Sequence, residues 1–473
     1  MLALGAALVL PEPDAMPAPS PHRAPFVWGQ DNLWQRLESA YDAARERGCA
    51  VETPAIDEGL RALDAKLDRL EAETISADSR LLSAIEEDLF ELGARFGACP
   101  DRTPEFAERT GRLRRLAKEQ SRGWDVAHER ASRDALYRLL YGSRAALEEL
   151  LLQMPEAPGL LEGVHEPSAT PSVELRGVTL HSGDVLASRG GAPTSAFIAR
   201  GNDYPGNFSH IALLHVSEDG VPRVIESHIE SGVGVFSAEH YLGDTKLRIM
   251  VLRMRADHPA LVDDPMLPHR AASAALEAAE AGHIPYDFAM NTEDAEELFC
   301  SEVASAAYAD RGVTLWAGLS SMSSPGLTRW LSRFGVEHFE TLAPSDLEYD
   351  PQMRVVAEWR DPDTLFDDHV DNAILDVLLE GAERGDEVQY DASQTPLARL
   401  AKGYSAVLNL FGAVGPIPEG MSATVGLRVQ WLNARHETVR EGVRQRVATY
   451  REAHARRPPY WSLVEMARQA ASQ

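Results

Sequence analysis

Residues 297–308 read ELFCSEVASAAY, which places one of the chain's three cysteines at the start of an apolar, alanine-rich stretch. This pattern predicts a helix over about 300–309, with Cys300 in its first turn. Two interpretations of the thiol compete. Most free cysteines are small core residues. A thiol at a helix start can instead be an accessible nucleophile, because the partial positive charge of the helix terminus lowers its pKa.

The composition around this stretch restricts the class of protein. The chain has 473 residues, of which 44% are hydrophobic and 25% charged, as expected for a soluble globular protein of two or three domains. Its formal charge of -27 disfavours nucleic acids and anionic bilayers as partners. No stretch approaches the roughly 18 to 20 apolar residues of a transmembrane helix. We therefore predict no nucleic-acid partner and no transmembrane segment.

Residues 1–26 begin with the apolar run MLALGAALVL and continue with proline, alanine and serine. This pattern is read either as a secretory signal that lacks a basic start or as a disordered tail. The signal interpretation is favoured by the two remaining cysteines. It predicts an extracytoplasmic location, periplasmic or secreted, with the cytoplasm as the alternative.

Cys49 and Cys99 each follow a glycine-marked helix end, in RERGCAVETP and GARFGACPDR. If the segment between them is a third helix, the chain runs up, down and up, and both thiols reach the same end of a bundle. A disulfide there would require an oxidising compartment. The alternative is two unpaired thiols in a cytosolic protein.

Residues 27–155 are predicted to form a helical bundle, because leucines and isoleucines recur at alternating spacings of four and three. Thr53 and Pro54 indicate a helix start, with a cap followed by proline in the first turn. Residues 156–176 are rich in proline, serine and glycine and predict a linker. Residues 363–473 are again helical and charged, with a break at GAVGPIPEG. The two apolar stripes of the bundle are Ile56, Leu60, Leu63, Leu67 and Leu70, then Leu82, Ile85, Leu89, Leu92 and Phe96.

Residues 177–362 differ in sequence pattern from both helical regions. Short β-branched runs alternate with turn clusters such as SEDGVP, and helical stretches lie around 271–281 and 300–309. This mixture predicts an α+β domain with an antiparallel sheet, flanked by the N-terminal bundle and the C-terminal helical region. The predicted strands are DVLAS, SHIALLHV, RVIESHI, KLRIMVLRM and MRVVAEW.

A thiol nucleophile needs a base, and the base needs an orienting acceptor. His210 opens the run SHIALLHV, and Glu226 lies in the next predicted strand. In an antiparallel hairpin they share a face only if paired residue numbers sum to an even value. His215 and His228 are the rival bases. His215 differs in parity from His210, whereas His228 shares the face of Glu226.

Six fragments, in order, resemble the circularly permuted papain-like hydrolases of the NlpC superfamily, in particular the YiiX/YebB-like group. The match covers about 180–359 and leaves both helical flanks unexplained. The fragments are HSGDVLASRGG, NFSHIALLHV, RVIESHIESGVGVFS, IPYDFAM, LFCSEVASAAY and LAPSDLEYDPQMRVVAEW.

This resemblance implies that Cys300 is the nucleophile, His210 the general base and Glu226 the orienting residue. Tyr286 matches a tyrosine near the family's site and is either an oxyanion donor or a half-buried aromatic. We expect Asp184 and Asp287 to fix turns.

Two segments depart from the family pattern. The acidic NTEDAEE, residues 291–297, is expected to bend away from the thiol, and the long segment around 316–340 is read as a lid or a wall of the cleft.

The resulting hypothesis is a cysteine hydrolase that cleaves an amide, isopeptide or ester through a thioester. The resemblance implies peptidoglycan peptides or acyl lipids as substrates, and the sequence does not choose between them. We predict no metal and no other cofactor, because the chain has no HExxH motif and no paired cysteine ligands. The alternatives are an inactive papain-like scaffold that acts through its helical flanks, whose protein partner is unknown, and an acyltransferase.

Overall fold

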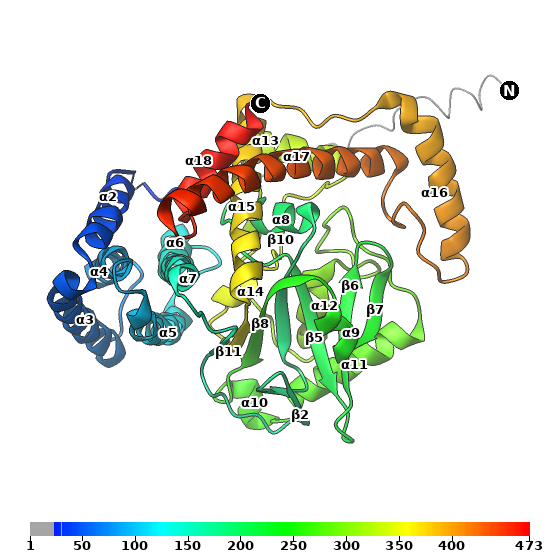
Figure 1. Cartoon of the computed structure of the whole chain (residues 1–473). Coiled ribbons are helices and arrows are strands. Elements are labelled where there is room, and N and C mark those ends of the chain that lie inside the picture. The colour runs from blue at the N-terminus through cyan, green and yellow to red at the C-terminus, as the bar shows by residue number, and fades with distance from the viewer. Residues whose placement is uncertain (1–22, 30) are drawn as a thin grey trace.

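The computed structural model describes residues 23–29 and 31–473, with the side chains of 31 and 32 excepted. The signal or tail predicted over 1–26 therefore lies outside the described residues, apart from its last four. Of these, Phe26 donates its backbone N–H to Asp203 O at 2.8 Å and packs against Tyr137. Figure 1 shows the N-terminal helices on one side of a central sheet and the C-terminal helices across one end.

The N-terminal region is an all-helical bundle, and both predicted leucine stripes are buried in it. The predicted helix start at Thr53 and Pro54 is wrong. Gly48, at a φ of 84°, breaks the chain instead, and the next helix begins at Cys49 with Pro54 inside it. The helices are α2 (Asp31–Arg47), α3 (Cys49–Ala72), α4 (Arg80–Phe96), α5 (Thr103–Gln120), α6 (Arg130–Tyr137) and α7 (Ser143–Gln153).

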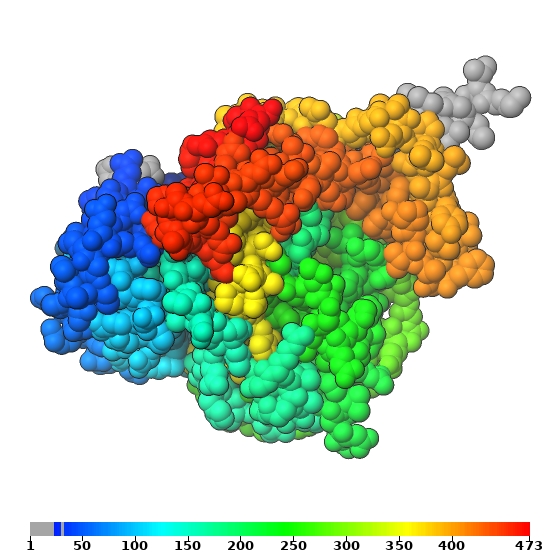
Figure 2. Space-filling view, viewed as in Figure 1, coloured from blue at the N-terminus to red at the C-terminus, as the bar shows by residue number. Residues whose placement is uncertain are grey.

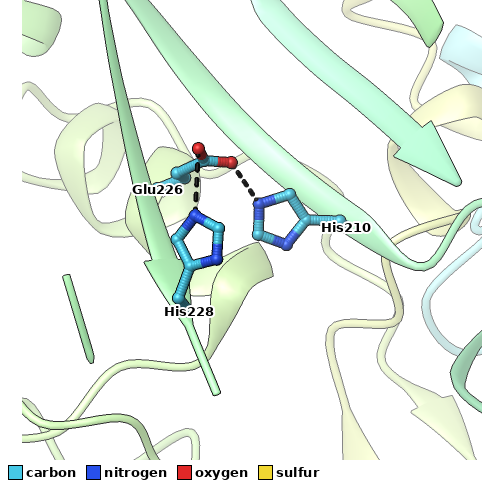
Figure 3. Close-up of side chains that lie close together, drawn as sticks. All are labelled: His210, Glu226 and His228. Atoms are coloured by element: carbon cyan, nitrogen blue, oxygen red, sulfur yellow. Dashed lines mark hydrogen bonds and ion pairs between the residues drawn. The ribbon is translucent and has the colours of Figure 1, made fainter. Parts of the chain in front are cut away.

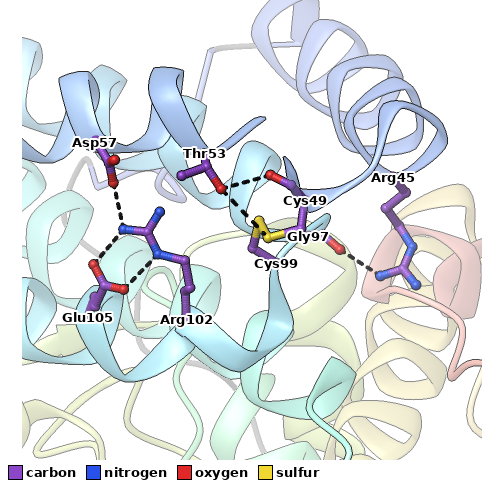
Figure 4. Close-up of a disulfide and its surroundings, with 8 residues drawn as sticks. All are labelled: Arg45, Cys49, Thr53, Asp57, Gly97, Cys99, Arg102 and Glu105. Carbon is purple, nitrogen blue, oxygen red and sulfur yellow. Dashed lines mark hydrogen bonds and ion pairs between the residues drawn. A yellow bond between two sulfur atoms is a disulfide. The ribbon is translucent and has the colours of Figure 1, made fainter. Parts of the chain in front are cut away.

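Cys49 and Cys99 form a disulfide, which confirms the pairing favoured by the sequence. The up, down and up course of α2, α3 and α4 brings both cysteines to one end of the bundle, with their Cα atoms 4.8 Å apart. Arg45 donates to the Gly97 carbonyl at 2.7 Å beside the bridge (Figure 4). The bridge closes a loop of 50 residues, which is expected to stabilise the fold by roughly 2–4 kcal/mol.

The central sheet has seven strands in the order β1-β11-β8-β4-β5-β6-β7, with antiparallel pairing throughout. Its edge strand β1 (Leu160–Glu162) comes from the predicted linker, so 156–176 is more ordered than its composition indicates. The pairing of β1 with β11 explains this order. The other strands are β4 (Val185–Gly190), β5 (His210–Val216), β6 (Pro222–His228), β7 (Gly232–Ser237), β8 (Lys246–Met254) and β11 (Met353–Trp359), with β2 (Ser172–Leu175) and β3 (Val178–His181) in a separate hairpin.

Helices cover the face of the sheet to which Ile211 and Leu213 point. Val303 and Ala304 of α12 pack into the same core as these two residues, together with α11. The central helices are α8 (Pro193–Arg200), α9 (Ala238–Gly243), α10 (Pro259–Asp263), α11 (Leu267–Ala281), α12 (Cys300–Ala309), α13 (Pro325–Arg333) and α14 (Asp346–Tyr349), with a small sheet of β9 (Ser320–Ser321) and β10 (Glu340–Thr341).

The C-terminal region has its own core, and the segment around 316–340, interpreted as a lid or a wall of the cleft, contributes to it. Trp330 of α13 is 1% exposed, stacks edge-on against Trp431 and donates to Asp386 O at 2.8 Å. The burial of Trp330 in this core disfavours the lid interpretation. The helices are α15 (Pro362–Arg384), α16 (Thr395–Asn409), α17 (Ala423–His454) and α18 (Tyr460–Ala471).

Buried ion pairs join both helical regions to the sheet. Glu148 of α7 accepts hydrogen bonds from Arg248 of β8 at 2.6 and 3.0 Å and from Arg360 at 2.7 Å. Arg248 also meets Asp368 of α15 at 2.6 Å, and Arg360 meets Glu358 of β11 at 3.0 Å. All five side chains are buried. We call this set the Glu148 cluster.

Candidate active site

His210 and Glu226 lie on one face of the sheet, as the even-sum register requires. Ala212 pairs with Glu226, and these numbers sum to an even value. The Nε2 atom of His210 lies 2.6 Å from Oε2 of Glu226 (Figure 3). Because an ionised carboxylate only accepts, this nitrogen carries the proton. His210 therefore keeps Nδ1 as the ring nitrogen that can take a proton from another group.

His228 is the second partner of the same carboxylate. It follows Glu226 by two residues in β6, so its side chain points to the same face. Its Nε2 lies 3.0 Å from Oε1 of Glu226 (Figure 3). Burial by itself would raise the pKa of Glu226, but the interactions with His210 and His228 outweigh it and hold this pKa well below its usual range. Glu226 is therefore a buried anion between two imidazoles.

Cys300 is the first residue of α12, as predicted, and it approaches His210 at the start of β5. Its Sγ lies 3.8 Å from the carbonyl oxygen of Ser209, the neighbour of His210. The Glu302 carboxylate accepts the Phe299 N–H at 3.0 Å and so fixes the first turn. The thiol is 3% exposed, so the expectation that the helix start makes it accessible is not met in this conformation.

The pKa of His210 reflects this neighbourhood. Burial by itself lowers it, but the side-chain interactions with Cys300 and with Glu226 outweigh burial and raise it to about 9. A histidine whose cationic form is favoured in this way is suited to accept a thiol proton. We call His210, Glu226, His228 and Cys300 the Glu226 cluster.

Tyr286 lies in the loop before α12 and is half-buried. Burial raises its pKa well above the usual value, and the neighbouring charge of Cys300 adds to this shift. The phenol is therefore neutral and near the thiol. Both interpretations of Tyr286, as an oxyanion donor and as a half-buried aromatic, agree with this placement.

The acidic loop before α12 bends into solvent as expected, since residues 292–297 are exposed. Its charge still reaches the helix start. Burial is the main cause that raises the pKa of Glu302 to about 8, and Asp287 and Asp294 raise it further against the hydrogen bond from Phe299. Asp287 accepts the backbone N–H of Met290 at 2.9 Å, which is the turn-fixing role expected of it.

The other residues singled out from the sequence lie away from the thiol chemistry. The Asp184 carboxylate accepts the His181 N–H and both guanidinium arms of Arg253, each at 2.8 Å. His215 points to the opposite face of the sheet and stacks on His269 at 5.3 Å. The prediction from parity that His215 and His210 point to opposite faces of the sheet is therefore confirmed.

Sequence reasoning missed two features of the site. His228 was weighed as a rival base, although the two-residue period from Glu226 could have identified it as a second partner of the carboxylate. Tyr241 of α9 is buried, and burial followed by the charge of Glu226 raises its pKa. No motif in the sequence indicates this tyrosine.

The ligand atoms of His210, Glu226 and His228 lie within 4.8 Å of one another, a spacing that a metal ion could bridge. Their contacts at 2.6 and 3.0 Å already account for this arrangement as histidine–carboxylate pairing. The geometry therefore does not by itself require a cation.

The described residues also enclose a cavity of about 1370 Å³ between the bundle and the C-terminal helices. Aromatic side chains such as Trp28, Tyr141 and Trp461 line it, together with Arg200 and Asp376. None of the Glu226 cluster lines this cavity, so its size alone does not connect it with the thiol.

Residues 179–357 match the model of a family described as "permuted papain-like amidase enzyme, YaeF/YiiX, C92 family". The match confirms the resemblance to the YiiX-like group, and it supports a hydrolase of the amidase type. The α+β fold with helical regions on both sides is also confirmed. Comparisons with curated proteins and with solved structures gave no match. Among the described residues, no helix has the length and apolar character needed to cross a membrane.

Proposed function

We propose that this protein is a cysteine hydrolase that cleaves an amide, isopeptide or ester bond through a thioester on Cys300. The observation that carries the proposal is the 2.6 Å contact between Glu226 and His210, beside a thiol that raises the pKa of the same imidazole. His210 is the general base, and Glu226 holds its tautomer and orientation.

The proposed reaction begins at Nδ1 of His210, the ring nitrogen that does not contact Glu226. The Cys300 S–H proton passes to Nδ1 of His210, and the sulfur attacks the substrate carbonyl carbon to form a C–S bond. When the tetrahedral intermediate collapses, the C–N or C–O bond breaks and His210 gives its proton to the leaving amine or alcohol. Water, deprotonated by His210, then attacks the thioester and releases the acid, and the proton returns to the Cys300 sulfur.

The oxyanion of both steps needs donors near the thiol. The first backbone N–H groups of an α-helix have no intrahelical acceptor, and those of Cys300 and Ser301 open α12. They would hold the oxyanion together with the helix dipole. The neutral phenol of Tyr286 is the candidate third donor.

The family description supports a peptide-type amide as the substrate class, with peptidoglycan fragments and acyl lipids as the two kinds to compare. An extracytoplasmic location is part of the proposal. The Cys49–Cys99 disulfide supports it, because such bonds persist in oxidising compartments.

The test incubates the protein with peptidoglycan fragments and with acyl lipids, with and without added amine and alcohol acceptors, and follows the products by mass spectrometry. We expect a Cys300-linked acyl adduct and product release, both absent in Cys300→Ser. His215→Gln is the matched control, since this histidine faces the other side of the sheet, and it should keep activity. Products formed equally by Cys300→Ser would refute the thiol mechanism, and acceptor-linked products would indicate a transferase.

The burial of the thiol favours one alternative, an inactive scaffold, because Cys300 is only 3% exposed. Iodoacetamide labelling near neutral pH separates the two. Rapid alkylation that is slowed by His210→Ala supports the enzyme. Reactivity no greater than that of a free peptide thiol supports the scaffold.

A further inference from the structure

The outer face of α16 exposes an unusual concentration of apolar side chains. Eleven large hydrophobic residues are exposed among the described residues, and seven of them lie within 397–414. Leu397, Leu400, Tyr404 and Val407 recur at the spacing of one helix face. Leu410 and Phe411, in the turn that ends the helix, are 83% and 82% exposed. With Val414 these residues form what we call the α16 face.

The inner side of α16 is already packed. Ala398 is buried in a small core with Ile417, Met421 and Val425. The Lys402 ammonium donates to the carbonyl oxygens of Pro418 and Glu419. The helix is therefore fixed to its own return loop, and the outward direction of the α16 face follows from this packing.

The charge of this segment is opposite in character to that of the whole chain. Residues 395–418 contain no Asp or Glu, while the chain carries a formal charge of -27. Their charged residues, Arg399 and Lys402, are cationic and lie off the α16 face. This is the part of an acidic protein that can approach an apolar interface with the least electrostatic repulsion.

The α16 segment also stands at one edge of the molecule, connected by loops at both ends (Figure 1), and forms the orange margin of the surface in Figure 2. Its return loop meets the loop that carries Tyr286. A side chain at Gly420 would collide with Phe288, and His283 pairs with Glu419 at 2.7 Å. The α16 face is thus attached to the loop that leads to Cys300.

We propose that the α16 face docks on the surface of a lipid bilayer, with Leu410 and Phe411 inserted at the level of the acyl chains. An amphipathic helix that presents leucine and aromatic residues on one side, without acidic groups, binds in this manner. Exposed apolar patches of this extent indicate an interaction surface.

A bilayer fits these observations better than a protein does. Its two most exposed residues, Leu410 and Phe411, lie side by side in the turn that ends the helix, where they can insert together into a deformable interface. A second copy would bring together two chains that each carry a charge of -27. The same charge predicts that anionic lipids weaken the binding at low salt and that added salt restores it.

The experiment measures co-sedimentation of the full chain with phosphatidylcholine vesicles, with and without phosphatidylglycerol. We expect wild-type protein to bind phosphatidylcholine. The double substitution Leu410→Asp and Phe411→Asp should lower the partition coefficient about tenfold or more. Val221→Asp with Val262→Asp is the matched control, since these valines are 53% and 67% exposed elsewhere, and it should bind like wild type.

A second variant keeps the test decisive if the aspartates disturb folding. The Phe411→Trp variant adds a tryptophan, whose fluorescence is obtained by subtracting that of the wild type. This fluorescence should shift to shorter wavelength on vesicles and be quenched by brominated phosphatidylcholine. Absence of this quenching, or no vesicle binding by the wild type, would overturn the proposal. Sedimentation equilibrium tests a second copy: dimers that Leu410→Asp with Phe411→Asp dissociates would assign the face to self-association instead.

The apolar run at 1–10 needs its own control. Leu8→Asp with Val9→Asp should leave vesicle binding unchanged. Binding that is lost in this variant and retained in Leu410→Asp with Phe411→Asp would move the membrane contact to the N-terminal run and overturn the proposal.

One consequence rests on the proposed function, namely that the substrate is carried on a bilayer. Leu410→Asp with Phe411→Asp should then lose hydrolysis of vesicle-borne acyl substrate and keep hydrolysis of a soluble one. Binding is measured also with Cys300→Ser, which should bind vesicles like wild type. Docking by an inactive wild type would refute only the hydrolase, and hydrolysis without docking would refute only the α16 proposal.

Discussion

Two clusters of buried charge lie on the same sheet and differ in how they end. In the Glu148 cluster, every member meets an opposite charge, and the ion pairs run from Asp368 of α15 through β8 and α7 to Glu358 of β11. The Glu226 cluster runs from His228 through Glu226 to His210 and ends on a thiol. A cluster made only of ion pairs holds elements together, whereas a chain that ends on a nucleophile can move a proton.

The largest expected effect comes from Cys300, the thiol on which the Glu226 cluster ends. Cys300→Ser should lower kcat/KM by at least about 10⁴-fold, because the weaker nucleophile leaves only binding and oxyanion stabilisation. The melting temperature should stay close to that of the wild type, since the change is small and nearly isosteric. Kinetics on the substrate that the product screen identifies, with calorimetry in parallel, check both statements. A large loss of stability with turnover retained would contradict the comparison, because Cys300 would then have the structural role that we assign to the Glu148 cluster.

The Glu148 cluster should show the opposite response, with a loss of stability and no loss of turnover. Glu148→Gln removes the buried anion that Arg248 and Arg360 share and leaves each arginine with its other acidic partner alone, which we expect to lower the free energy of unfolding by about 3–5 kcal/mol. The kcat of the folded protein should not change. Urea denaturation measures the stability. Glu149→Gln is the matched control, because Glu149 is the next residue of α7 and an amide oxygen can still accept the Tyr460 N–H that its carboxyl group accepts at 3.0 Å.

Glu226→Gln probes the orienting role directly. An amide can still accept from Nε2 of His210 but loses the negative charge that raises the pKa of His210, so we expect kcat/KM to fall about 10²-fold. The alkaline limb of the pH–rate profile should shift to lower pH. An unchanged pH–rate profile would mean that Glu226 contributes packing alone and has no electrostatic effect on His210.

The pH dependence of stability should be smaller still. The pKa of His210 is raised from its ordinary value of 6.5 to about 9, so its contribution is full below about 6.5 and disappears as the pH rises through 9. The lowered pKa of Glu226 gives a contribution that is present above about 4.5 and is lost as the pH falls further. His210→Gln should therefore cost about 1–3 kcal/mol near pH 6 and much less at pH 10. Denaturation curves at both values, compared with His215→Gln, test the sign.

Local patterns predicted most elements of the fold correctly. The strands 246–254 and 353–359, the helix from Cys300 and both leucine stripes are found where periodicity indicates them. The errors have tertiary causes. Pro54 lies inside a helix because Gly48 breaks the chain earlier. The composition of 156–176 hides two strands, because β1 is ordered by pairing with β11 and β2 by pairing with β3.

The candidate site was accessible to sequence reasoning for a related reason. Parity within a hairpin fixes that His210 and Glu226 share a face and that His215 does not, and the family resemblance supplies Cys300. The resemblance says nothing about Tyr241, which approaches Glu226 from α9, or about the burial of the thiol. Both depend on how separate elements pack.

The sequence by itself determined the elements and the faces of their residues, because helix and strand periods act over a few positions along the chain. Only the tertiary structure decided that Glu226 lies between two imidazoles, that Glu148 fastens both helical regions to the sheet, and that α16 exposes its apolar face. These features depend on distances between residues far apart in the chain, and such distances are set by the packing of the whole core.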